Sequence, residues 1–137
     1  MQEQIDAHIA SQAEPKRSDL LALHKRVLNI KPDVRLWFYD GRDDKGKIVT
    51  NPNIGYGFCT LQYAKGDTKE FYQIGISATK TGISIYILGK KDLSYLAKTF
   101  AKSIGKATLT SYCIKFKKLQ DVNLETLDAA LRYGFEV

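Results

Sequence analysis

The stretch from Asn53 to Leu88 constrains the fold more than any other part of the sequence. Three runs rich in Tyr, Ile and Phe are separated by KGDTKE (65–70) and SATKTG (77–82). Runs of β-branched and aromatic residues bounded by Gly, Asp, Thr and Lys are typical of short strands joined by tight turns. The stretch therefore predicts a meander of antiparallel strands.

The alternation of side chains in this stretch predicts which face of the sheet is buried. Residues of one parity are apolar, and we expect them on the core face: Tyr72, Ile74, Ile76, Ile83, Ile85 and Ile87. Residues of the other parity are then expected on the outer face: Phe71, Gln73, Ser77, Ser84 and Tyr86. Between Ile54 and Leu61 the apolar residues change parity, which predicts a bulge or strong coil near Gly57.

The flanking segments predict helices that cover the core face. Apolar residues at helical spacing favour helices over 2–10 and 18–30. The second helix has Ser18 as its N-cap and an apolar stripe of Leu20, Leu21, Leu23, Val27 and Leu28. Another helix is capped by Asp92 and has Leu93, Leu96, Ala97, Phe100 and Ile104 on its core side. A last helix is capped by Asn123, buries Leu124, Leu127 and Leu131, and ends at Gly134. Alternation also predicts strands over 34–39 and 112–117, the second at an edge or facing solvent.

Length and composition indicate one ordinary globular domain spanning 1–137, with 44% hydrophobic and 26% charged residues. Cys59 and Cys113 lie in apolar runs without metal-ligand or CxxC spacing, so we interpret both as buried thiols. The N-terminal residues lack the pattern of a signal peptide, and no run of about 18 apolar residues predicts a membrane span. We therefore expect a cytoplasmic protein that does not associate with a membrane.

Few residues suit catalysis. The only histidines are His8 and His24, both in predicted helices, and no nucleophile motif surrounds either cysteine. A histidine among leucines, as His24 is, is more often a packed core residue than a base or a ligand. A pair of catalytic carboxylates stays open, but enzyme is the least favoured class, and no cofactor and no metal-binding residue is predicted.

Positive charge is concentrated in residues 80–118, which carry nine lysines and one acid, whereas the rest of the chain has a net charge of −2. Lysines interspersed with core residues usually form a solvated face, but an anionic partner is the alternative. The candidate anion-facing side chains are Lys80, Lys90, Lys91, Lys115, Lys117 and Lys118.

The wording of four segments resembles the YdhG-like family of domains of unknown function: PKRSDLLALHKRVLNIKPD (15–33), NIGYGFCTLQYAKGD (53–67), IGISATKTGISIYILG (74–89) and SYCIKFKKLQDVNLETL (111–127). The likeness spans roughly residues 5–132. The chain departs from the family in SIGKATLTSYC, where a KTGK-type phrase is usual, and in a longer loop from Asp40 to Asn53. The resemblance implies an α+β, frataxin-like fold, with an antiparallel sheet of about five strands and helices on one face.

Three functions follow as hypotheses. The first is a non-enzymatic binding or chaperone-type module that recognises a protein or small ligand through Trp37, Tyr39, Phe71 and Tyr86, unless the longer loop or a partner subunit covers that face. The resemblance also implies an alternative, intracellular iron binding as in one branch of the family, although the first long helix offers only Asp19 as an acid. The third is nucleic-acid binding through the lysines of 80–118.

Overall fold

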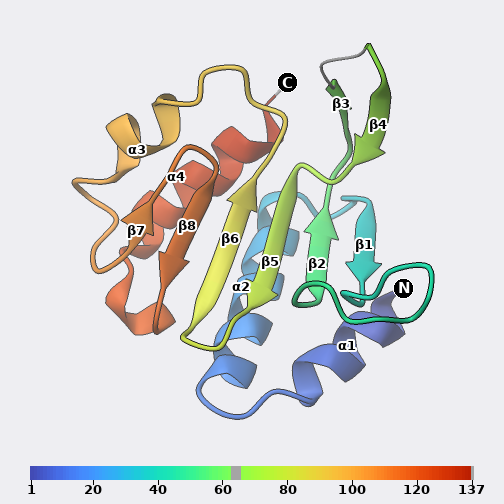
Figure 1. Ribbon diagram of the computed structural model, residues 1–137. Coiled ribbons are helices and arrows are strands. Elements are labelled where there is room, and N and C mark those ends of the chain that lie inside the picture. Colours follow the sequence, from blue (N-terminus) through green and yellow to red (C-terminus); the bar gives the residue numbers. More distant parts are fainter. Residues whose placement is uncertain (63–65, 137) are drawn as a thin grey trace.

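The computed structural model describes residues 1–62 and 66–136, and it has the α+β architecture that the sequence predicts (Figure 1). The helices are α1 (Gln2–Ala10), α2 (Lys16–Ile30), α3 (Tyr95–Phe100), the short 3-10 helix η1 (Leu119–Asp121) and α4 (Leu124–Phe135). The strands are β1 (Leu36–Tyr39), β2 (Asn53–Tyr56), β3 (Cys59–Gln62), β4 (Thr68–Phe71), β5 (Ile74–Ala78), β6 (Ile83–Ile87), β7 (Thr108–Leu109) and β8 (Cys113–Phe116).

All neighbouring strands pair antiparallel. The main sheet has six strands in the order β1-β2-β5-β6-β8-β7, and β3 and β4 form a separate two-stranded sheet. The stretch 53–88 contributes three strands to this sheet, as expected, and the main sheet exceeds the predicted count of about five only by the two-residue strand β7. Strand β8 also lies inside the sheet, between β6 and β7, and not at its edge.

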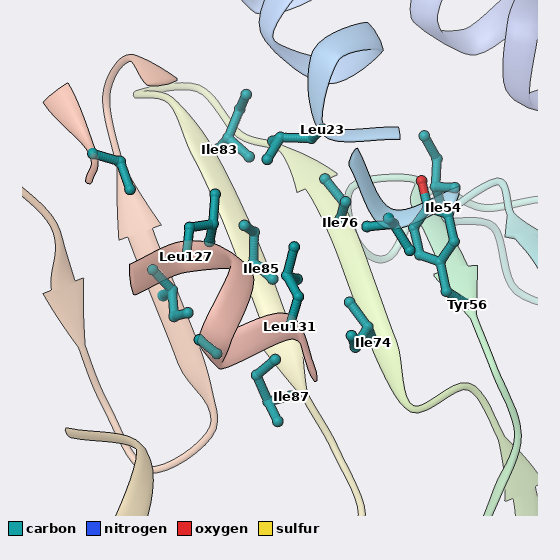
Figure 2. Close-up of a cluster of buried hydrophobic side chains, with 14 of the residues drawn as sticks. Leu23, Ile54, Tyr56, Ile74, Ile76, Ile83, Ile85, Ile87, Leu127 and Leu131 are labelled. Atoms are coloured by element: carbon teal, nitrogen blue, oxygen red, sulfur yellow. The ribbon is translucent and has the colours of Figure 1, made fainter. Parts of the chain in front are cut away.

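One hydrophobic cluster joins the inner face of the sheet to the helices (Figure 2). The isoleucines of β5 and β6 point toward α2 and α4, where Leu23 and Leu131 meet them, and they are at most 2% exposed. Helix α1 buries Ile5 and Ile9 at the margin of the same cluster. The predicted core face is therefore confirmed for every residue except Tyr72, which is treated below.

The change of parity near Gly57 marks a break between strands. Gly57 has a φ of +86°, and the chain leaves the main sheet there to enter the β3–β4 hairpin. In Figure 1 this hairpin projects beyond the end of the sheet. The predicted bulge was wrong because β2 ends at Tyr56 and does not continue through the glycine.

Several predicted helix boundaries were also wrong. Helix α2 begins at Lys16, because the Glu14 carboxylate, and not a Ser18 cap, accepts the Ser18 N–H at 2.9 Å. Helix α4 continues through Gly134, which packs against Ile74. Three leucines placed on core stripes, Leu21, Leu93 and Leu124, are exposed. By contrast, the N-cap of α4 is confirmed, since the Asn123 side chain accepts the Thr126 N–H at 3.0 Å.

Within the residues described, no helix combines the length and the apolar composition that crossing a bilayer requires.

Candidate functional site

A row of residues crosses the outer face of the sheet, the face opposite α2 and α4 (Figure 1). The register aligns Trp37 of β1 with Gly55 of β2, Gly55 with Gly75 of β5, and Gly75 with Tyr86 of β6. Because strand residues of one parity share a face, these four positions form a strip with large rings at its ends and two glycines between them. The strip is a shallow trough between Trp37 and Tyr86.

Tyr72 fills this trough, which corrects its predicted place on the core face. A Cβ atom on Gly55 or Gly75 would lie 2.3 or 2.6 Å from atoms of the Tyr72 ring, so the ring rests directly on both glycines. Tyr72 lies in the link between β4 and β5, outside any strand, and parity along β5 therefore does not apply to it. Burial, with a smaller contribution from Tyr86 and Tyr39, raises the pKa of Tyr72 to about 12.

The ring of Trp37 anchors the β3–β4 hairpin to the main sheet. It stacks on Phe71 at 6.2 Å with an interplanar angle of 11°, and its indole N–H donates to the Gly57 carbonyl at 2.7 Å. Cations lie on the two rings, since the Arg35 guanidinium is 4.2 Å from the Trp37 ring and the Lys69 ammonium is 4.9 Å from the Phe71 ring. These contacts give Trp37 and Phe71 a structural role, although both rings stay half-exposed.

The other side of the trough carries a second aromatic pair. Tyr86 stacks on Tyr112 at 6.3 Å, and Tyr112 is 52% exposed. We call the outer-face set Trp37, Tyr39, Phe71, Tyr72, Tyr86 and Tyr112 the aromatic band. Its four predicted members are not fully buried: Tyr39 is 37% exposed and the others are half-exposed. Sequence reasoning missed Tyr72 and Tyr112 because it counted both as strand residues, whereas each precedes its strand and does not follow the alternation of that strand.

The candidate lysines do not form one surface. Lys80, Lys117 and Lys118 line one hollow beside the start of α2, whereas Lys90 and Lys91 line another near the end of α4. Lys115 pairs with Ser84 and projects from the outer face of β8. The 80–118 segment therefore presents its charge in three places, and a nucleic-acid strand tracking all six lysines is not favoured.

A hollow of about 600 Å³ lies where the β3–β4 hairpin meets the end of α4. Cys59 lines it, half-buried where full burial was predicted. Burial raises the pKa of this thiol despite the nearby Lys90 ammonium, which is the reverse of an activated nucleophile. Lys90 is itself held by the Glu136 carbonyl at 2.6 Å and by the Tyr133 ring at 4.4 Å. Among the residues described, its ionisable lining consists of Cys59, Lys90, Lys91, Tyr133 and Glu136.

The remaining chemistry-bearing residues serve the core. His24 is 4% exposed and bonded to Tyr56, as expected for a packed histidine, and Cys113 is buried as a free thiol. Across 1–62 and 66–136, no three side chains of His, Cys, Asp or Glu gather closely enough to hold a metal ion.

No protein-family model, no curated protein and no solved structure matches this chain. The resemblance to YdhG-like domains thus stays a prediction.

Proposed function

We propose that this protein is a non-enzymatic binding module that recognises an acidic protein segment on the outer face of its sheet. The observation that carries the proposal is the aromatic band on the face opposite α2 and α4. Its rings come from β1, β4 and β6, from the link before β5 and from the residue before β8, and all of them except the buried Tyr72 are partly exposed. Tyrosine and tryptophan supply large contact areas with few rotatable bonds, and they are enriched where proteins recognise one another.

Charge on this face supports an acidic partner. Arg35, Lys69 and Lys115 border the band and are exposed, and the chain has a net charge of +6. The acids closest in sequence are Asp40, directly after Tyr39, and Glu70, directly before Phe71. Glu70 alternates with Lys69 and Phe71 along β4, so it belongs to the opposite face of the β3–β4 hairpin. Complementary charge at the rim of an interface steers association and suppresses wrong partners, so the band favours Asp- and Glu-containing segments.

A cytoplasmic location remains a prediction from the sequence.

Selection from a library of random displayed peptides tests the proposal. We expect the selected peptides to be enriched in Asp and Glu. In ¹⁵N-labelled protein they should shift amide resonances of β1, β5, β6 and β8. The triple variant Tyr39→Ser/Tyr86→Ser/Tyr112→Ser should bind them at least ~10-fold more weakly, because interface energy is concentrated in a few aromatic side chains.

A matched control removes apolar side chains from the helical side. The exposed fractions of Leu21 and Leu124, 40% and 39%, are similar to the 37% of Tyr39. Because these leucines lie on the helical side, Leu21→Ser/Leu124→Ser should leave peptide binding unchanged. Circular dichroism of both variants verifies that they fold. Equal binding by the wild type and the tyrosine variant, or resonance shifts confined to α2 and α4, would refute the proposal.

A further inference from the structure

A second surface, separate from the aromatic band, gathers positive charge around a hollow. Its volume is about 390 Å³, and it is lined by Pro15, Lys16, Lys80, Thr81, Lys117 and Lys118. These residues come from the start of α2, the β5–β6 turn and the segment after β8, which meet at one end of the sheet (Figure 1). Four of the six lining residues are lysines and none is an acid.

Backbone packing brings the lysines together. Gly82 closes the β5–β6 turn, and a Cβ atom there would lie 2.2 Å from the Phe116 carbonyl oxygen and 2.9 Å from the Lys117 Cα. The turn that carries Lys80 therefore lies directly against the chain that carries Lys117. Lys16 is fixed from the other side, because its ammonium donates to the carbonyls of Thr79, at 2.5 Å, and Lys80, at 3.3 Å.

The neighbouring acids are engaged elsewhere. The Glu14 carboxylate accepts hydrogen bonds from Ser18 and Arg17, and the Asp19 carboxylate accepts the Leu119 N–H at 3.1 Å. Within the described parts of the chain, none of the four lysines lies within 4 Å of a carboxylate. Lys16 is also the first residue of α2, so the positive end of that helix dipole adds to the charge.

We propose that this hollow binds a phosphate-bearing small molecule. Several ammonium groups and the Thr81 hydroxyl suit a group that carries more than one negative charge, and lysine binds phosphate as a point charge. The volume is near the lower limit of ligand pockets, which span ~300–1,000 Å³, so it fits a diphosphate or a phosphorylated metabolite. A compact site of this kind differs from a groove that follows a nucleic-acid backbone.

Titration of the full chain with inorganic pyrophosphate, followed by calorimetry and by ¹⁵N amide shifts, tests the proposal. We expect the largest shifts at residues 79–82 and 116–118. The triple variant Lys80→Gln/Lys117→Gln/Lys118→Gln should bind pyrophosphate at least ~10-fold more weakly, since it removes three of the four cations. These three side chains are exposed, so the variant should fold.

The control variant Lys98→Gln/Lys102→Gln/Lys106→Gln changes the net charge equally at three exposed lysines and should bind pyrophosphate like the wild type. An equal loss in both variants would overturn the proposal, because it would indicate diffuse attraction. Absence of amide shifts near the hollow would also overturn it. So would tighter binding of an oligothymidine that depends equally on both sets of lysines. None of these outcomes depends on the aromatic band, so the two proposals succeed or fail independently.

Discussion

The Nδ1 atom of His24 lies 2.7 Å from the hydroxyl oxygen of Tyr56 in the layer between α2 and β2. The other ring nitrogen, Nε2, lies 3.2 Å from the side-chain amide nitrogen, Nε2, of Gln2 in α1. A neutral imidazole with its proton on Nδ1 satisfies both contacts, because it donates to Tyr56 and accepts from Gln2. The His24 and Tyr56 side chains are at most 4% exposed and link α2 to the sheet, and the exposed Gln2 side chain extends this link to α1.

Replacing Tyr56 with phenylalanine should destabilise the protein by ~1–3 kcal/mol, because the His24 ring N–H would be left buried without an acceptor. Chemical denaturation of Tyr56→Phe measures the free energy of unfolding. Tyr112→Phe removes a hydroxyl from a ring that is 52% exposed, and it should change that free energy by less than ~0.5 kcal/mol. Equal losses in the two variants would show that the buried hydrogen bond contributes nothing specific.

The two histidines should make the fold sensitive to mild acid. Burial lowers the pKa of His8 and of His24, with Asp6 partly opposing the shift at His24. The Nε2 atom of His8 is buried beside Phe38 and has no hydrogen-bond partner among the described residues. Because the unfolded chain keeps the ordinary histidine pKa of 6.5, it binds more protons than the folded chain below that pH.

The free energy of unfolding should therefore keep its full histidine contribution above pH ~6.5. It should fall as the pH drops from there toward the lowered pKa values of the two histidines. Urea denaturation across this range measures the slope. The variant His8→Gln/His24→Gln keeps every carboxylate, so its shallower slope isolates the contribution of the histidines. A variant with the same slope as the wild type would mean that other groups cause the acid sensitivity.

The sequence predicted the layered fold because its strongest periodic signals came from residues that remain within regular elements. The isoleucines of β5 and β6 alternate over five residues each and face the helices as expected. Asn123 carries a local signal that needs no tertiary contact, and it caps α4. His24 was interpreted from its position on an apolar stripe, and helix packing leaves that position buried.

The same reasoning failed for residues that lie between strands. Parity assigned Tyr72 to the core, but the chain changes direction between β4 and β5, and the ring lies on Gly55 and Gly75. The aromatic band depends on this contact and on the register of β2 with β5, which no local pattern encodes. The hollow lined by Lys80 and Lys117 likewise depends on a contact between Gly82 and Phe116, which are distant in sequence.

The Asn123 cap provides a prediction for the C-terminal helix. Asn123→Ala should destabilise the protein by ~1 kcal/mol, because it removes the acceptor for the Thr126 N–H. Asn29→Ala is the matched control: Asn29 is exposed inside α2, where alanine favours the helix, so this variant should be neutral or slightly more stable. Thermal unfolding measures both, and an equal effect of the two substitutions would contradict the cap.

Gly134 tests whether close packing or helix propensity dominates in α4. Alanine favours a helix over glycine by ~1 kcal/mol, so an open site would gain stability. At Gly134, however, a Cβ atom would lie 2.9 Å from Cγ1 and Cδ1 of Ile74 and 3.2 Å from Cδ1 of Ile87. Overpacking of a filled core costs ~1–3 kcal/mol, so Gly134→Ala should lower the free energy of unfolding.

A double-mutant cycle with Ile74→Val identifies the cause. Valine lacks the Cδ1 atom, so Ile74→Val alone should cost ~0.5–1.5 kcal/mol, whereas Gly134→Ala in the valine background should cost less than in the wild type. Denaturant midpoints of the four proteins give the coupling. Additive costs would mean that α4 shifts as a whole to accept the methyl group, and a gain in stability from Gly134→Ala would mean that helix propensity outweighs contact with β5.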